Sequence, residues 1–232
     1  LLSDPRVDPS VDGNYAIQLA SENGHIEIVE LLLADARVDP SAEDNYAINL
    51  AAQNGHDRVV KRLLKDPRVD PSADNNYALT WAAQNGHAKT VEILISDPRV
   101  DPTTDQFNPL RLASQASHTK VVELLINDSR IPPTADFDLP IRWAAENGYT
   151  ELVERLLEND QVNPAAENNY AIKMASRNGH KKIVEILIND PRVSPDAEKN
   201  YAIRYASYFG HTAVVEILLK DTRVDPGTYD DY

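Results

Sequence analysis

The sequence of 232 residues contains no cysteine, and its single methionine lies well inside the chain. Without cysteine, disulfide bonds and thiolate zinc sites are excluded. No apolar run reaches the roughly 18 residues that a membrane-spanning helix needs. The chain also opens without an initiator methionine, a basic stretch or an apolar signal segment. These absences favour a cytoplasmic location and no membrane partner.

Basic residues are scarce relative to acidic ones. There are 23 Lys and Arg against 37 Asp and Glu, so the formal net charge is −14. An acidic surface repels phosphate backbones, which makes a nucleic-acid partner a poor fit. The overall acidity favours solubility and a partner with basic character.

A short phrase, Asp-Pro-Arg-Val-Asp-Pro-Ser, returns along the chain with a fixed spacing of 31 residues. A constant spacing in the range of about 20–50 residues indicates a solenoid, in which each unit packs only against its neighbours. Gln161 replaces the arginine of the phrase in one copy. The arginines of the other copies are Arg6, Arg37, Arg68, Arg99, Arg130, Arg192 and Arg223.

One unit, from Asp66 to Ile95, shows what each copy encodes. Two prolines and the polar run 74–76 predict a loop, and Asn76 is placed to cap a helix that begins at Tyr77. Gly86 predicts the end of that helix, and a second helix follows from about residue 88. Helices this short are unstable alone, so packing must hold them.

The pattern resembles the ankyrin repeat, on motifs that cover essentially the whole chain. Two copies keep the family's proline step, at Pro109-Leu110 and Pro140-Ile141, and most copies keep a Gly-His pair such as Gly86-His87. The resemblance implies an all-α solenoid of helix-turn-helix units. The family's unit has about 33 residues, so we expect the connecting hairpins to be shortened or to be plain loops.

Tyrosine replaces the family's capping threonine, and we expect asparagines to cap instead: Asn14, Asn45, Asn76, Asn169 and Asn200.

We interpret residues 1–232 as a single array of about 7.5 units. Leu1-Leu2 matches the end of a second helix, and Asp231-Tyr232 matches the opening of another unit, so both ends fall within a repeat. One reading is an excerpt of a longer array. The other is a structural protein whose open ends stack head to tail into a filament, because contacts that do not close generate fibres.

Catalytic and metal sites find no support in the sequence. No nucleophile or phosphate-loop motif is present, and every histidine sits at the repeated Gly-His position. A ladder with one histidine per unit does not converge on one ion. Loop aspartates such as Asp70 and Asp74 are calcium-type ligands, but the loops lack the EF-hand spacing. We therefore expect no enzyme activity, no cofactor and no metal, and we expect the Arg-Val-Asp ladder to form exposed ion pairs.

The variable positions lie on the first helix of each unit, which borders the partner-binding groove in the family that the chain resembles. At one such position the side chains change from neutral to basic, and the basic ones are Arg111, Arg142, Lys173 and Arg204. These side chains either pair with loop carboxylates such as Glu198 or form a basic stripe that selects an acidic peptide.

Aromatic residues gather in one late copy, as Tyr201, Tyr205, Tyr208 and Phe209. Tyr208 and Phe209 replace residues that are mostly polar elsewhere, and aromatic side chains with arginine make good interface anchors. The predicted function is a non-catalytic protein-interaction scaffold that binds through the groove and loop tips. The candidate binding residues are Arg111, Arg142, Lys173, Arg204, Arg177, Tyr205, Tyr208 and Phe209.

The copy from Asp97 to Asn127 is the most divergent, with Phe107, Ala116 and Ser117 breaking the pattern. Serine in place of glycine costs up to about 1 kcal/mol where a left-handed backbone is required. The sequence therefore predicts a local weak point or a bend in this copy.

Overall fold

The computed structural model describes residues 7–103 and 108–225, apart from the side chain of Phe137. Within these residues there are fourteen helices and no strand, which confirms the all-α prediction and makes the connections plain loops. None of these helices has the length and apolar character needed to cross a bilayer. Leu1, Leu2, Phe107, Asp231 and Tyr232, on which parts of the sequence interpretation rest, lie outside the described residues.

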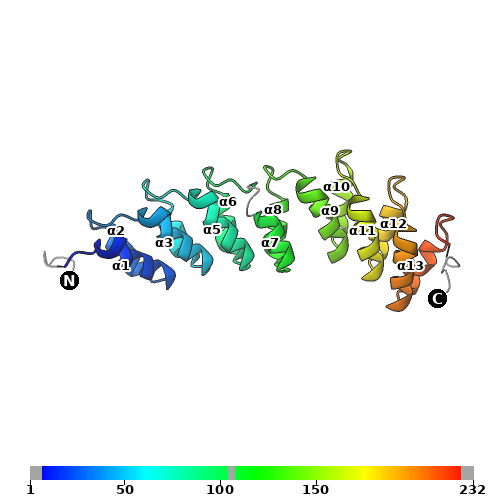
Figure 1. Ribbon diagram of the computed structural model, residues 1–232, viewed down its shortest axis with the longest axis horizontal. Coiled ribbons are helices and arrows are strands. Elements are labelled where there is room, and N and C mark those ends of the chain that lie inside the picture. Colours follow the sequence, from blue (N-terminus) through cyan, green and yellow to red (C-terminus); the bar gives the residue numbers. More distant parts are fainter. Residues whose placement is uncertain (1–6, 104–107, 226–232) are drawn as a thin grey trace. The chain divides into compact units, whose positions relative to one another are not determined.

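The chain forms two compact units, Leu1–Ile131 and Pro132–Tyr232, and in each the helices follow one another in pairs (Figure 1). The helices of the first unit are α1 (Val11–Glu22), α2 (Ile26–Leu33), α3 (Ala42–Gln53), α4 (Asp57–Leu63), α5 (Ala73–Gln84), α6 (Ala88–Ile95), α7 (Pro109–Gln115) and α8 (Thr119–Ile126). Those of the second are α9 (Ala135–Asn147), α10 (Thr150–Leu157), α11 (Ala166–Arg177), α12 (Lys181–Ile188), α13 (Ala197–Tyr208) and α14 (Thr212–Leu218).

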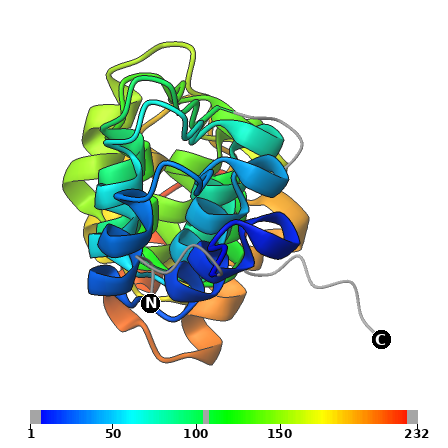
Figure 2. The ribbon, with the colours of Figure 1, turned by 90° about the vertical axis from the view of Figure 1, so that its left-hand side faces the viewer.

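Each repeat buries a small apolar core against the next repeat in its unit. In the third repeat, from Asp66 to Ile95, Leu79, Val91 and Leu94 are completely buried, as are the small residues Ala82 and Ala83. The small side chains let the first helices of successive repeats approach closely, and α3 and α5 pack side by side. In the first unit, the paired helices form two layers, and Figure 2 shows this unit end-on with α1 and α2 toward the viewer.

The predicted caps are wrong. In the third repeat, Asp74, Asn75 and Asn76 all adopt the left-handed backbone region, with φ of 51°, 55° and 60°. An N-cap residue instead has an extended backbone. Asparagine and aspartate tolerate the left-handed region better than other non-glycine residues, which explains the composition of this turn. The same correction applies to the remaining predicted caps, Asn14, Asn45, Asn169 and Asn200, which are also left-handed.

The asparagine of each left-handed turn connects one repeat to the next. The side-chain oxygen of Asn76 accepts a hydrogen bond of 2.9 Å from the backbone N–H of Asp101, in the following repeat. The corresponding bond from Asp70 to Asn45 measures 2.7 Å, and the one from Asp39 to Asn14 measures 2.8 Å. We call this series the asparagine ladder.

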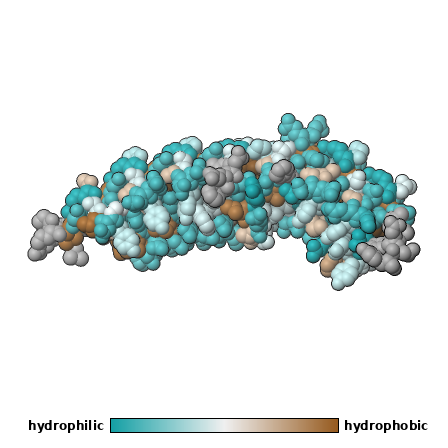
Figure 3. Space-filling view, viewed as in Figure 1, coloured by the Kyte–Doolittle hydropathy of each residue, from teal (hydrophilic) through white to brown (hydrophobic). Residues whose placement is uncertain are grey.

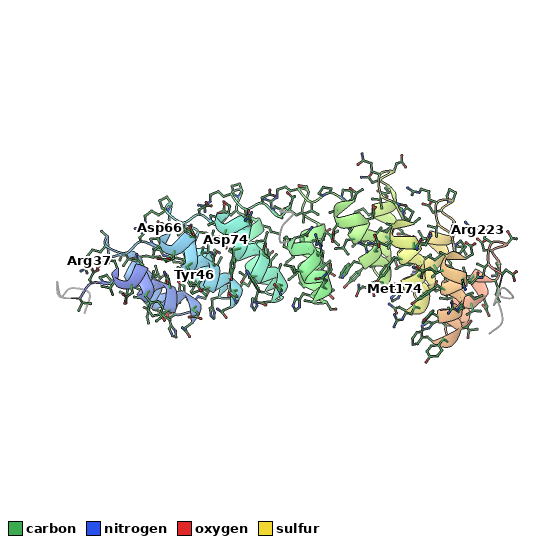
Figure 4. The ribbon with its side chains drawn as sticks, viewed as in Figure 1. Arg37, Tyr46, Asp66, Asp74, Met174 and Arg223 are labelled. Atoms are coloured by element: carbon green, nitrogen blue, oxygen red, sulfur yellow. The ribbon has the colours of Figure 1, made fainter. Side chains whose placement is uncertain are left out.

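The repeated arginine makes a second connection. The guanidinium of Arg99 is held by Asp97, two residues earlier, and donates through Nη1 to the carbonyl oxygen of Val69 in the preceding repeat, at 2.8 Å. Exposed ion pairs are present, but the partner of each arginine is the aspartate two residues before it and not the aspartate of the Arg-Val-Asp sequence. Each arginine also connects two repeats; Figure 4 labels three residues of these pairs, Arg37, Asp66 and Arg223. Hydrogen bonds from the arginine lower the pKa of the paired carboxyl group, for Asp35 to about 2. We call this series the arginine ladder.

The Gly-His pair makes the third connection. The Nε2 atom of His87 lies 2.9 Å from the carbonyl oxygen of Gln53, at the end of the preceding repeat's first helix. Its ring covers Gly55, whose φ is +73°, so closely that a β-carbon on Gly55 would lie 2.5 Å from Nδ1. The glycine is therefore required both by its left-handed backbone and by the next repeat's histidine. We call this series the histidine ladder.

Two glycine substitutions separate these requirements. Gly210→Ala places its β-carbon in open space, so we expect only the backbone strain of about 1 kcal/mol. Gly55→Ala meets the His87 ring as well, and we expect a loss of more than about 2 kcal/mol in urea unfolding. In Gly55→Ala, adding His87→Ala should recover part of the loss. Equal effects of the two glycine substitutions would contradict this account.

Candidate functional site

Two of the four basic first-helix residues, Arg142 and Arg204, bond to the loop of their own repeat. The guanidinium of Arg142 donates to the carbonyl oxygen of Asp136 at 2.9 Å, and that of Arg204 donates to Lys199 at 3.4 Å. The neutral residue Gln18 makes the same kind of bond, to Gly13 at 2.8 Å. This position therefore has a structural task in neutral and basic copies alike, because it satisfies a carbonyl of the left-handed turn.

Lys173 is the most buried of the basic candidates, with 6% of its surface exposed. Its Nζ atom lies 2.7 Å from Oε1 of Glu198 and 5.6 Å from the ring centroid of Tyr201. The hydrogen bond from Lys173 lowers the pKa of Glu198. The pairing with a loop carboxylate that the sequence left open is therefore present at this position.

Arg111 is exposed and lies in the first unit, on α7. That helix begins at Pro109, and the side chain of Asn108 caps it by accepting a hydrogen bond from the backbone N–H of Arg111 at 3.2 Å. This asparagine directly precedes the proline of its repeat. The other seven candidate residues lie in the second unit, so they are treated separately from Arg111.

Cation–aromatic pairs connect successive first helices of the second unit. Arg142 on α9 lies 5.8 Å from the ring centroid of Tyr170 on α11, and Arg177 on α11 lies 5.6 Å from that of Phe209 beside α13. The hydroxyl of Tyr170 donates to Glu146 at 3.0 Å, and burial, reinforced by Glu146, raises the pKa of Tyr170 to about 12. Such pairs contribute about 0.5–2 kcal/mol each, depending on exposure.

One cluster combines aromatic rings with exposure to solvent. Tyr208 is 81% exposed and Phe209 is 45% exposed, although both are large and partly apolar. Their rings meet edge to face at 4.9 Å, and Phe209 stacks at 6.4 Å on Tyr205. Arg177 lies over the ring of Phe209, 5.6 Å from its centroid. We call Arg177, Tyr205, Tyr208 and Phe209 the aromatic patch.

The molecular face shown in Figure 3 is mostly hydrophilic. Sequence analysis identified all four residues of the aromatic patch, but it missed His211, whose ring stacks on Phe209 at 6.4 Å. No sequence signal distinguished this histidine, because it belongs to the repeated Gly-His position. His211 also belongs to the histidine ladder, since its Nε2 lies 2.9 Å from the carbonyl oxygen of Arg177.

The loop aspartates have partners of their own. The carboxylate of Asp70 accepts hydrogen bonds from the backbone N–H and the hydroxyl of Ser72, at 2.9 and 2.6 Å. These bonds lower the pKa of Asp70 and fix the turn that leads into α5. Among the described residues, no three His, Cys, Asp or Glu side chains are grouped closely enough to hold a metal ion.

Burial divides the candidate residues into two classes with different expected mutational effects. Lys173→Gln removes a buried charge from its partner, and we expect a loss of about 1–3 kcal/mol in unfolding free energy. Tyr208→Gln changes a mostly exposed side chain, and we expect a change within about 0.5 kcal/mol. Urea unfolding of both variants checks this, and a larger loss for Tyr208→Gln than for Lys173→Gln would contradict the assignment.

Comparison with known proteins agrees with this architecture. A family model described as "Ankyrin repeats (3 copies)" matches residues 1–75, 48–136 and 141–230. The human ASB11 ankyrin repeat domain, a solved structure, is similar in fold with a TM-score of 0.51 and 15% identity, over 80% of this chain and 95% of that one. No curated protein matches the sequence. Ankyrin repeat domains are generally protein-interaction modules and are typically non-catalytic. On the family match, which spans most of its length, this chain belongs to the ankyrin repeat family.

Proposed function

We propose that this chain is a protein-binding scaffold and that the aromatic patch anchors its partner. The observation that carries the proposal is the 81% exposure of Tyr208 beside Phe209, at positions that are polar in most other repeats. Exposed tyrosine and arginine side chains supply most of the binding energy at many protein interfaces. Tyrosine also offers a large contact area at a low cost in conformational entropy.

The charge of the patch indicates the kind of segment that fits it. Arg177 places a cation at the patch in a chain whose net charge is −14. A carboxylate of the partner would pair with Arg177, and an apolar or aromatic side chain beside that carboxylate would cover Phe209 and Tyr208. The proposed partner is therefore a protein segment with an acidic residue next to a large apolar one. We include the exposed Arg111 and the basic residues Arg142, Lys173 and Arg204 in this proposal as secondary contacts to the partner.

Selection from a random peptide library displayed on phage tests the proposal. The wild-type chain should enrich peptides that carry Asp or Glu beside Phe, Tyr, Trp or Leu. The variant Tyr208→Gln/Phe209→Asn replaces the two aromatic residues with the residues of the third repeat, Gln84 and Asn85. We expect this variant to lose the enrichment and to keep its helical circular dichroism, because both side chains are exposed.

Leu31→Gln is a matched control, because Leu31 is an exposed apolar residue, 62% accessible, on α2 of the other unit. This variant should recover the same peptides as the wild-type chain. Enrichment that survives in Tyr208→Gln/Phe209→Asn, or that disappears in Leu31→Gln, would refute binding through the aromatic patch.

End-to-end association is the second candidate. It is favoured by the exposed apolar residues of the first repeat, Ile28 at 48% and Leu31 at 62%, on α2. The equivalent of Ile28 in the next repeat, Val59, is 1% exposed because another repeat packs against it. Association through this surface would make the sedimentation coefficient of the wild-type chain rise with concentration and that of Leu31→Gln stay constant.

A further inference from the structure

The first helices of the first unit carry a row of partly exposed tyrosines. Tyr15 on α1 is 53% exposed and Tyr46 on α3 is 43% exposed, and Tyr77 on α5 continues the row. These helices pack side by side, because α3 contacts both α1 and α5. Figure 4 labels Tyr46 and, on the neighbouring helix, Asp74. The three tyrosines belong to none of the three ladders.

A carboxylate lies three residues before each of these tyrosines, in the left-handed turn that opens the helix. Burial raises the pKa of Tyr77, and the nearby Tyr46 and Asp74 raise it further, so neighbouring helices share one cluster. No ion pair joins these carboxylates to a cation within the part of the chain that the structure describes. We call this set the tyrosine face: Asp12, Tyr15, Glu43, Tyr46, Asp74 and Tyr77.

The helices that form the tyrosine face contain no basic residue. All charged residues of α1, α3 and α5 are acidic. In the second unit, by contrast, every first helix carries a cation: Arg142 on α9, Lys173 on α11 and Arg204 on α13. The two units therefore present first helices of opposite charge.

The second unit shows which group fits between such a tyrosine and carboxylate. The Nζ atom of Lys173 lies 2.7 Å from Oε1 of Glu198 and 5.6 Å from the ring centroid of Tyr201. The equivalent positions of the first two repeats hold Gln18, Glu43 and Tyr46. The carboxylate and the tyrosine are thus kept, and the cation is replaced by a neutral side chain that bonds to the carbonyl oxygen of Gly13.

The carboxylate of Glu43 already has the placement of Glu198. Oε1 of Glu198 lies 3.5 Å from the side-chain nitrogen of Asn168, in the turn of the preceding repeat. Gly13 is the equivalent of Asn168, and a β-carbon on Gly13 would lie 3.0 Å from Oε1 of Glu43. Both carboxylates therefore reach the preceding turn. Since Glu43 and Tyr46 are exposed, a cation from outside the chain has access to them.

We infer that the tyrosine face binds a basic segment of a protein partner, whose Lys or Arg side chains take the place that Lys173 has in the second unit. A tyrosine ring attracts a cation through its quadrupole, and the carboxylate adds a charge-assisted hydrogen bond. The net charge of −14 steers such a segment toward the chain. This site is separate from the aromatic patch, which carries the cation Arg177 and is proposed to take an acidic segment.

The spacing of the repeats sets the spacing of the cations in the partner. Packed helices lie about 8–10 Å apart. A polyproline II segment has about three residues per turn and rises about 3.1 Å per residue, so every third side chain lies on one face, about 9 Å from the next. A segment with Lys or Arg at every third residue therefore reaches Glu43–Tyr46 and Asp74–Tyr77 in turn.

Fluorescence polarisation of a labelled peptide of repeated Lys-Pro-Pro units, titrated with the full chain, tests this inference. The comparison peptide has the same composition with all its lysines adjacent, and we expect it to bind about tenfold more weakly because it cannot match the repeat spacing. Glu43→Gln/Asp74→Asn should abolish the preference for the spaced peptide. The matched control, Glu27→Gln/Glu30→Gln, removes the same charge from exposed positions on α2 and should keep the preference.

Gln18→Lys supplies the missing cation from within the chain. Its lysine should pair with Glu43 as Lys173 pairs with Glu198, and the spaced peptide should bind more weakly. If this variant does not fold, Tyr46→Leu removes the ring at an exposed position and should also weaken binding. Tyr208→Gln/Phe209→Asn should change nothing here, so the two binding proposals fail separately. Equal binding of the two peptides, or equal losses in the α2 control and in Glu43→Gln/Asp74→Asn, would overturn the inference.

Discussion

The structure depends on side chains of one repeat that form hydrogen bonds with backbone groups of a neighbouring repeat. The histidine bonds to a carbonyl at the C-terminal end of a first helix, such as that of Gln53, where backbone acceptors have no partner within the helix. The arginine does the same for a loop carbonyl, and the asparagine accepts a loop N–H. Because short helices are unstable alone, these bonds and the buried apolar stripe hold the repeats in place. The constant spacing of 31 residues follows, since one inserted residue would displace all three partners.

The sequence was sufficient to predict the helix pairs, the glycine turns and the buried stripe, because each follows from local chemistry or from helical periodicity. It was not sufficient for the asparagines. Asn76 precedes a helix and looks like a cap, but its partner is the N–H of Asp101 in the next repeat, and only the folded structure brings these two together. The arginine of the repeated phrase was likewise predicted to form surface ion pairs, and its bond to the preceding repeat was hidden for the same reason.

For the candidate binding residues too, the sequence indicates the residue type but not the contacts with residues of other repeats. The sequence revealed that Lys173 is basic and variable, but its burial against Glu198 depends on the loop of the following repeat. The equivalent positions of the other repeats are mostly polar, which indicated that Tyr208 and Phe209 are exposed. The structure shows that both are exposed. In this chain the variable positions divide between residues that stabilise a loop and residues that remain open to a partner.

The most direct test of the central claim is residue-resolved hydrogen exchange in the full chain carrying Arg68→Gln. The guanidinium of Arg68 bonds to the carbonyl oxygen of Val38, so its removal should weaken only the junction between the second and third repeats. Amide protection should fall most in α3 to α6 and should fall progressively less with distance along the first unit. A uniform loss of protection over all described helices, or no loss in α3 to α6, would contradict the view that bonds between neighbouring repeats hold this fold together.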